Sequence, residues 1–215
     1  RVDRRQRQMC IRDRFNTLVD RGYNAKILNK NEIKRLEPNL QDIPKEAIFT
    51  SLEGAAEADK VALEMLKNVS KKGGRVLSGC TVLGLKFKKA CISAVQTNIG
   101  EMQCDMVAIA TGAATQNGLE GFEWRLPMQN KKGLIVQTAP LPQLINHVLM
   151  TNDVHFKQNT DGSFTAGEIY SGDLKKGVVP LELAYDVLSR ISKKLNSSEN
   201  LTPTNIKIGT RPVPI

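Results

Sequence analysis

The stretch Asp105–Thr115, DMVAIATGAAT, has the residue types that a ligand-binding turn needs. Met106–Ala110 is an apolar run without polar alternation, which is typical of a β-strand covered on both faces in a parallel α/β sheet. The run ends at Thr111 and Gly112, where the absence of bulky side chains lets a ligand approach the backbone. Open α/β sheets bind ligands at the carboxyl ends of their strands. The segment therefore predicts either a ligand-binding turn or an ordinary strand-to-loop turn.

Side chains that bind metals are scarce. The candidates are four cysteines and two histidines: Cys10, Cys80, Cys91, Cys104, His147 and His155. The cysteines show no C-x-x-C spacing, so we expect neither a zinc site nor any other metal centre. Unpaired cysteines on strand-like segments behave as small apolar residues in a reducing compartment, and we expect a cytoplasmic protein.

Length and composition indicate a globular protein with a real core. The chain has 215 residues, of which 40% are hydrophobic, and this suits one large domain or two small ones. No apolar run approaches the roughly 20 residues that cross a bilayer, so we expect no integral membrane segment.

The charge of +9 suggests nucleic-acid binding, but much of it is local. Residues 1–14 contain six Arg and two Asp and supply +4, which leaves +5 for the rest of the chain. This segment resembles the translated sequencing-adapter peptide found in environmental assemblies, and we interpret it as non-native. The remaining lysines are scattered among few aromatic residues, as on a solvated surface. We therefore expect no nucleic-acid partner, with a basic nucleic-acid-binding module as the alternative from another functional class.

The elements around the glycine turn follow from periodicity and turn residues. In the first half we expect a short helix capped by Asn31, a strand at 47–52, a helix from Asp59 to Gly73, extended structure at 75–85 and short antiparallel strands at 87–98 and 100–104. Val76, Val82 and Leu85 are expected to be buried. In the second half we expect strands at 134–138, 147–150, 154–157, 163–166 and 206–208, a hairpin turn at Asp161-Gly162 and a helix from Pro180.

Six segments, taken together and in order, resemble the FAD-dependent amino-acid oxidase family that includes glycine oxidase, D-amino acid oxidase and sarcosine oxidase. They are NEIKRLEPNL at 31–40, GGRVLSGCTVLGL at 73–85, GEMQCDMVAIATGAAT at 100–115, LPMQNKKGLIVQT at 126–138, VHFKQNTDGSFTAGE at 154–168 and GTRPVP at 209–214. The resemblance covers the chain from about Asn31 to Ile215.

The resemblance implies an α/β plus antiparallel-β fold, in which a partial Rossmann-like FAD domain is interleaved with an antiparallel-sheet substrate domain. It implies that residues 15–55 hold substrate-domain and helical segments and that 56–118 form part of the FAD domain, with a β meander at 86–104. Residues 119–205 would form the substrate domain, and 206–215 would return to the FAD domain.

The resemblance also implies roles for particular residues. The cofactor would be FAD, with contacts from the backbone at Val82 and from the turn of Ala110, Thr111 and Gly112. Val82 is equally suited to a core strand. We assign no residue of this chain a catalytic role of its own.

Arg211, in GTRP, corresponds to the family's substrate arginine, whose planar guanidinium can hold an α-carboxylate bidentately. A lone arginine before proline is otherwise a surface residue. When the Asp161-Gly162 turn is aligned with the family hairpin, His155 matches a substrate-contacting tyrosine of glycine oxidase, and Tyr170 matches another position that lines the active site. The alternation of apolar and polar residues around His155 is equally typical of a half-exposed strand.

The sequence departs from the family pattern in three ways, the first being that the glycine-containing flavin-binding segment with which the family continues beyond Pro214 is missing. It lacks the N-terminal G-x-G-x-x-G loop that would hold the FAD pyrophosphate, so we expect a fragment that is inactive alone. Gln158-Asn159 replaces the frequent Pro-Arg of the relatives, which leaves the substrate class open. The reaction we expect is oxidation of the C–N bond of an amino acid or related amine by hydride transfer to flavin, with the electron acceptor undefined. The alternative within the same fold is a FAD-dependent 2-hydroxy-acid dehydrogenase.

Overall fold

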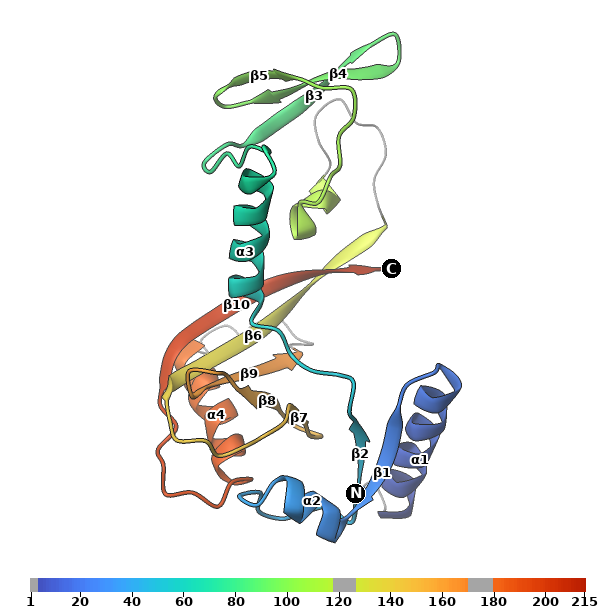
Figure 1. The fold of residues 1–215 in the computed structure, drawn as a ribbon, viewed down its shortest axis with the longest axis vertical. Helices are drawn as coiled ribbons and strands as arrows, with labels where there is room; N and C mark the ends of the chain where they lie inside the picture. The colour runs from blue at the N-terminus through green and yellow to red at the C-terminus, as the bar shows by residue number, and fades with distance from the viewer. Residues whose placement is uncertain (1–3, 118–126, 170–179) are drawn as a thin grey trace. The chain divides into compact units, whose positions relative to one another are not determined.

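The computed structural model of this chain describes residues 4–117, 127–169 and 180–215 (Figure 1). The helices are α1 (Arg4–Asp20), α2 (Lys30–Leu36), α3 (Ala58–Lys71), the 3-10 helix η1 (Gly112–Asn117) and α4 (Pro180–Ser192). The strands are β1 (Ala25–Asn29), β2 (Glu46–Thr50), β3 (Val82–Lys88), β4 (Cys91–Thr97), β5 (Gly100–Gln103), β6 (Met128–Pro140), β7 (Leu149–Met150), β8 (His155–Gln158), β9 (Ser163–Ile169) and β10 (Pro203–Pro214). The fold is a mixture of helices and antiparallel sheets, as the sequence predicts.

The chain divides into two compact units. Unit 1 comprises residues 1–56, 134–169 and 174–207, and unit 2 comprises residues 57–133, 170–173 and 208–215. Each unit is therefore assembled from segments that are distant in the sequence, and each is described below by itself.

A five-stranded sheet with strand order β10-β6-β9-β8-β7 organises unit 1, which contains residues 134–140 of β6 and 203–207 of β10, whereas the remaining residues of these two strands belong to unit 2 (Figure 1). The predicted hairpin is confirmed, because β8 and β9 pair antiparallel on either side of the Asp161-Gly162 turn. Gly162 has φ +87°, in the left-handed region that favours glycine. The Asp161 carboxylate accepts a hydrogen bond from the backbone N–H of Ser163 at 2.9 Å, which closes the turn.

Helix α4 packs against one face of this sheet and forms the core of unit 1. The residues it buries are spaced to share one side of the helix: Ala184, Val187, Leu188 and Ile191. They meet the sheet residues Leu134, Val136, Phe156, Phe164 and Ala166, and the rings of Phe156 and Phe164 stack with centroids 6.3 Å apart. Full burial of one such side chain contributes about 1.5–3 kcal/mol.

The first part of unit 1 is a small sheet of β1 and β2, paired antiparallel. Helix α2 follows β1 directly and is capped by Asn29 rather than by the predicted Asn31. The Asn29 side chain accepts from the backbone N–H of Asn31 and Glu32, and Glu32 accepts from the Asn29 backbone at 2.7 Å. This capping box explains the difference, because only Asn29 has a glutamate three residues ahead of it.

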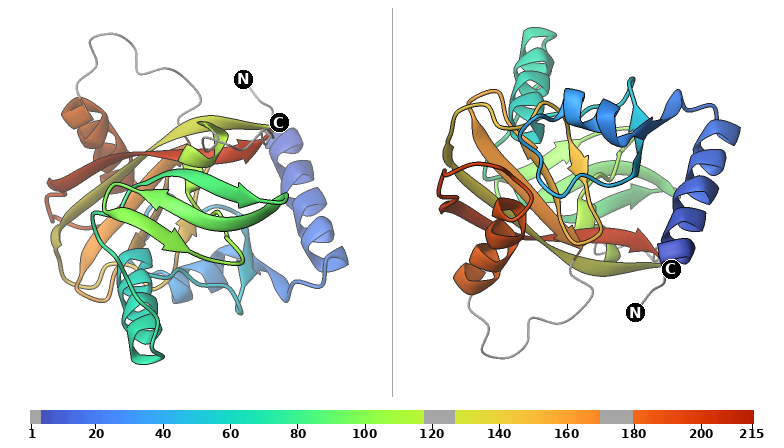
Figure 2. Two further views of the ribbon diagram at one scale, coloured as in Figure 1. Left: turned by 90° about the horizontal axis from the view of Figure 1, so that it is seen from above. Right: turned by 90° about the horizontal axis from the view of Figure 1, so that it is seen from below.

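Unit 2 contains a three-stranded antiparallel sheet of β3, β4 and β5 (Figure 2). The turn between β3 and β4 is at Lys89-Ala90, and the turn between β4 and β5 is at Asn98-Ile99. Lys89 and Ala90 have positive φ angles of 49° and 64°, so the first turn holds two non-glycine residues in the left-handed region.

Two predictions about unit 2 are wrong. Met106–Ala110 is not a strand and belongs to none of the three sheets of the described residues, and Met106 is 88% exposed. Val76 and Val82 are 41% and 40% exposed rather than buried, whereas Leu85 is buried as predicted. A strand exists only through pairing, and no described segment pairs with 106–110, so the apolar pattern alone does not produce one.

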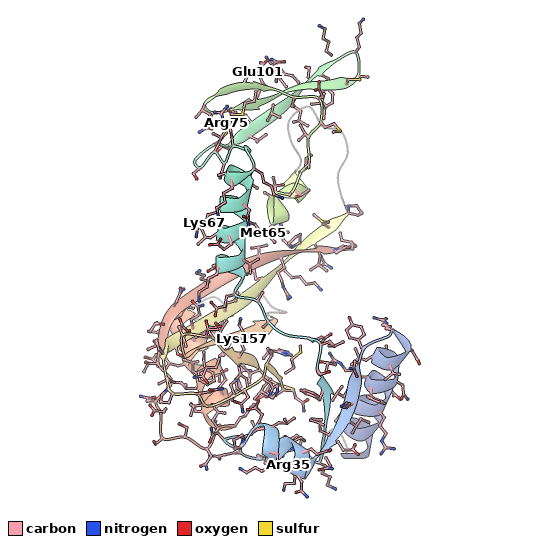
Figure 3. The ribbon with its side chains drawn as sticks, viewed as in Figure 1. Arg35, Met65, Lys67, Arg75, Glu101 and Lys157 are labelled. Carbon is pink, nitrogen blue, oxygen red and sulfur yellow. The ribbon has the colours of Figure 1, made fainter. Side chains whose placement is uncertain are left out.

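Helix α3 has the predicted apolar spacing, but it buries none of its residues among the described segments. Val61, Met65 and Val69 share one side of the helix and are 41%, 63% and 43% exposed. Met65 is labelled in Figure 3. Its first turn begins at Ala58 after Glu57, one residue before the predicted cap at Asp59. The helix is therefore amphipathic, and none of the described residues covers its apolar side.

Helix α1 runs through residue 14, where the sequence analysis placed the end of a non-native segment. Arg12 lies 3.6 Å from the Glu46 carboxylate of β2. The non-native origin of residues 1–14 remains a prediction. Within the described ranges, no helix combines the length and the apolar character that spanning a lipid bilayer requires.

Truncation of a core residue on α4 should destabilise unit 1. Ile191 is 0% exposed, so we expect Ile191→Ala to lower the free energy of unfolding by about 2–5 kcal/mol through lost burial and a residual cavity. Leu181→Ala on the same helix is the control, because Leu181 is 47% exposed, and its change should stay within about 0.5 kcal/mol. Urea unfolding followed by circular dichroism measures both, and equal losses would contradict the packing described here.

The end of α4 is tied to the β7–β8 turn by an ion pair with a defined pH dependence. Lys194 Nζ lies 2.8 Å from Asp153 Oδ1, and its hydrogen bond, helped by one from Thr151, lowers the pKa of Asp153 against the opposing effect of desolvation. A lowered folded-state pKa contributes stability above the unfolded value, about 3.9, and that stability is lost as the pH falls through the folded value.

Asp153→Asn should therefore lower the free energy of unfolding by less than about 1 kcal/mol at neutral pH, since the pair is partly exposed. The difference from the parent chain should disappear at a pH well below the pKa of Asp153, where neither chain carries the charge. Urea unfolding at both pH values measures this. If the free energy of unfolding differs between the two chains by the same amount at both pH values, the effect does not come from the charge of Asp153.

Candidate functional site

The predicted cofactor turn is an open left-handed turn in unit 2. Gly112 has φ +59°, and a Cβ added there would meet no described atom within 4 Å. The turn is closed by the Thr111 and Thr115 hydroxyl groups, 2.8 Å apart, and by the Ala114 N–H donating to the Thr111 carbonyl at 3.2 Å. Glycine is therefore required by the backbone angle, and the space beside it is free.

The other predicted cofactor residues also lie in unit 2 and are exposed. Ala110 and Thr111 precede the turn in a segment without strand pairing, and Val82 is the first residue of β3. An exposed backbone without bulky side chains suits a cofactor that is held through main-chain groups. The described residues of this region thus fit the contacts that the resemblance assigns to FAD.

Arg211 lies on β10, also in unit 2, and is exposed. Within residues 4–117, 127–169 and 180–215, its guanidinium has neither a hydrogen bond nor an ion pair. A guanidinium without an internal partner can use its fork of N–H donors for a carboxylate ligand.

His155 is the first residue of β8 in unit 1, where it pairs with Gly167 of β9 and Met150 of β7. Its side chain is partly buried, and its Nδ1 atom is buried without a hydrogen-bond partner among the described residues. Buried polar atoms are nearly always hydrogen-bonded, so this ring nitrogen is available to a polar partner beyond the described residues.

The predicted residues fall in both units. The cofactor residues and Arg211 belong to unit 2, whereas His155 belongs to unit 1. Tyr170, the third predicted substrate residue, lies outside the described residues.

The departure at Gln158-Asn159 has a structural explanation. The Gln158 side-chain oxygen accepts from the Leu144 N–H at 2.8 Å and the Ile145 N–H at 3.3 Å, and its amide nitrogen donates to the Pro142 and Gly162 carbonyls at 2.8 and 2.9 Å. Gln158 therefore fixes the loop before β7. Asn159 donates to the Ser163 and Thr165 hydroxyl groups.

Glu37 is a buried carboxylate, 3% exposed, that no sequence pattern indicated. Its oxygens accept from the Asn146 N–H at 3.1 Å and lie 2.7 Å from His147 Nδ1. Glu37 ends α2, and no local pattern marks a carboxylate whose partners lie more than 100 residues away.

Neither a cavity nor a metal-binding cluster among the described residues includes the predicted site residues. A shallow cavity of about 400 Å³ at the end of the β3–β5 sheet is lined by none of the predicted residues. Within the described ranges, no group of three or more His, Cys, Asp or Glu side chains is arranged to hold a metal ion.

The sequence matches the family model described as FAD dependent oxidoreductase over residues 2–213. Among curated proteins it is 28% identical, over 142 residues, to hydrogen cyanide synthase subunit HcnC of Pseudomonas aeruginosa. The aligned region covers 65% of this chain and 34% of that protein, so the chain spans about a third of this relative's length.

Three solved structures share the fold. Glycine oxidase from Bacillus cereus superposes with a TM-score of 0.81 at 18% identity, covering 95% of this chain and 56% of that chain. L-proline dehydrogenase from P. horikoshii gives 0.80 at 20%, covering 97% and 57%. L-amino acid deaminase from Proteus vulgaris gives 0.81 at 16%, covering 99% and 56%. At these identities the likeness concerns the fold alone.

Removal of the Gln158 amide should destabilise unit 1. Gln158→Leu leaves the Leu144 N–H without its acceptor, and we expect the free energy of unfolding to fall by about 1–3 kcal/mol. Gln96→Leu on β4 is the control, because Gln96 is exposed and its replacement should change stability by no more than about 0.5 kcal/mol. Urea unfolding measures both variants, and a Gln158→Leu variant as stable as the control would show that the loop does not depend on this side chain.

Proposed function

The chain belongs to the FAD dependent oxidoreductase family, and from this premise we propose that the whole protein oxidises the C–N bond of an amino acid or a related amine. The observation that carries the proposal is Arg211, an exposed guanidinium that has no partner among the described residues and belongs to the same unit as the open turn at Gly112. The names of its structural neighbours, which act on glycine, L-proline and L-amino acids, support an amino-acid substrate.

Val82, Ala110, Thr111 and Gly112 would hold the cofactor through the backbone, and unit 2 would accordingly be the cofactor unit. The exposure of these residues and the free space at Gly112 support this role. FAD, when bound, supplies the acceptor for the hydride that leaves the substrate Cα.

Arg211 would hold the substrate carboxylate. Two parallel N–H···O bonds from one planar group fix both the position and the orientation of a carboxylate, and hence the direction of the Cα–H bond. Loss of a hydride from Cα and of a proton from nitrogen converts the amine to an imine. Water then hydrolyses the imine to a carbonyl compound and ammonia or an amine, a step for which no residue of this chain is assigned.

His155 is proposed as a further substrate contact, on the resemblance and on the state of its ring nitrogen. Its unpartnered Nδ1 can donate or accept a hydrogen bond, depending on the tautomer, and so can serve a polar atom of the ligand. Tyr170 is proposed as a further substrate contact on the resemblance alone.

Arg211→Ala in the whole protein tests the proposal. Loss of a charge-assisted carboxylate contact should raise KM for the amine about 10- to 100-fold, with the FAD content unchanged. Arg75→Ala, which removes another exposed arginine of unit 2, is the control and should leave KM unchanged. Steady-state kinetics and the flavin absorbance of the purified protein give both quantities, and an unaltered KM in Arg211→Ala would remove Arg211 from the site.

The substrate class needs a separate comparison, because the same arginine would hold the carboxylate of a 2-hydroxy acid. Turnover of D- and L-amino acids is measured beside the matching 2-hydroxy acids. Oxidation of the hydroxy acids alone would replace the C–N reaction by the 2-hydroxy-acid dehydrogenase reaction.

A further inference from the structure

Strands β6 and β10 are neighbours in their sheet, and Figure 1 shows them side by side as β10 approaches the C-terminus. The Ile215 N–H, just after β10, donates to the Pro127 carbonyl, just before β6, at 3.0 Å, so the two strands are antiparallel. Further along, the Asn205 side chain donates to the Gln137 side chain at 2.9 Å. Gln137 is as far from Pro127 along β6 as Asn205 is from Ile215 along β10, so the register has no net shift between these two contacts.

The prolines of β10 support this register. Pro212 and Pro214 have no N–H, so they suit positions of a strand whose N–H would point away from the neighbouring strand. Such positions exist on β10, because it is an edge strand of the sheet. Paired and unpaired positions alternate along an edge strand, so Arg211 falls in the same set as Ile215, whose N–H does pair with β6.

The register places two cations opposite each other. Lys131 of β6 and Arg211 of β10 are equally far from the Pro127–Ile215 contact. Residues directly opposite in an antiparallel pair project from the same face, with Cβ atoms about 4.5–5.5 Å apart. Both side chains are exposed, and both residues belong to unit 2. Like charges at such a pair repel each other, and a ligand that offers negative charge to both removes the repulsion.

Lys132, the next residue of β6, projects from the other face, because side chains alternate along a strand. On that face the Asn130 amide donates to the Ala113 carbonyl of η1 at 3.4 Å. The two adjacent lysines therefore have different surroundings, and only Lys131 shares a face with Arg211.

The neighbouring rows on the face of Lys131 and Arg211 carry no charge. One row is Gln129 opposite Val213, and the other is Gly133 opposite Gly209. Neither glycine has a positive φ angle, so the backbone conformation does not require glycine at either position. A glycine within a strand often marks a place where another group approaches the backbone closely. The cation pair thus borders a row without side chains, along which a ligand chain can lie.

We propose that Lys131 is a specificity-determining residue that binds a second carboxylate of the substrate. The inference rests on the proposed function, in which Arg211 holds the carboxylate next to the reacting Cα–H, and it deepens that function. The planar fork of the arginine fixes the first carboxylate, and the flexible lysine attracts the second as a point charge. The substrate class is accordingly an acidic amino acid, or an amine with two carboxylate groups, in preference to a neutral amino acid.

Lys131→Gln in the FAD-loaded whole protein tests this inference, and Lys132→Gln is the matched control, since it makes the same change on the other face. Glutamate and aspartate are compared with norvaline and 2-aminobutyrate, which have the same chain lengths without the second carboxylate, and both enantiomers of each are used. Loss of a charge-assisted contact should lower kcat/KM for the acidic amino acids about 10- to 100-fold in Lys131→Gln. The values for the neutral amino acids should change by less than about twofold.

Lys132→Gln should leave the ratio of kcat/KM between acidic and neutral amino acids unchanged. Lys131→Gln should unfold at the same temperature as the parent protein or higher, because it removes the repulsion from Arg211. An equal loss for acidic and neutral amino acids would show that both cations hold one carboxylate, and it would overturn the inference. A parent protein that oxidises the neutral amino acids as well as the acidic ones would overturn it too.

A binding measurement separates failure of this inference from failure of the proposed function. Succinate and butyrate have the same chain length and differ in the second carboxylate, and calorimetric titration of the FAD-loaded protein with each requires no turnover. We expect succinate to bind at least about tenfold more tightly than butyrate, and this preference should disappear in Lys131→Gln but not in Lys132→Gln. Absence of amine oxidation with this pattern present would reject the proposed function and keep the second carboxylate site. Equal affinities, or no binding of succinate, would reject the site whatever the enzyme oxidises.

Discussion

The packing of α4 on one face of the five-stranded sheet is the interaction on which the structure of unit 1 depends. Ile191, Leu188 and Val187 are almost fully buried against Phe156 and Phe164. Because the side chains of a strand alternate, burial of one set fixes the direction of the other set. A slip of one residue would bring His155 into the core and expel Phe156. The core therefore positions the candidate substrate face without contacting it.

The structure of unit 2 also depends on packing, but there no described residues cover the apolar segments. Helix α3 has an apolar side, and Met106–Ala110 has the composition of a buried strand, but Met65 and Met106 are 63% and 88% exposed. Hydrophobic stabilisation is proportional to the area removed from water, so these segments contribute little as they stand. Periodicity reports what a segment is able to bury, whereas its structure depends on what lies beside it.

This distinction explains how much of the molecule could be predicted. The strands β8 and β9, the turn at Gly162 and the helix from Pro180 carry local signals, namely alternation, a turn glycine and 3.6-residue spacing, and the structure has them at those positions. Met106–Ala110 needed a pairing partner that local pattern does not reveal. The hydrogen bonds of Gln158 to the loop before β7, and those of Glu37 to residues 109 and 110 positions away, depend on the assembled unit. Of the candidate site, the sequence indicated the residue types and their order but not which polar atoms would lack partners.

Two residues that we assign to the site have features that suit a bound group. Gly112 occupies a left-handed turn with empty space beside it, and His155 buries a ring nitrogen without a partner among the described residues. A buried nitrogen without a partner is unfavourable for folding, and the described residues offer no group that offsets this cost. A folded chain retains such a feature where a bound group offsets it, because binding to the native state adds stability that the chain alone lacks. The resemblance selects the same two residues, so the physical argument and the family pattern agree on them.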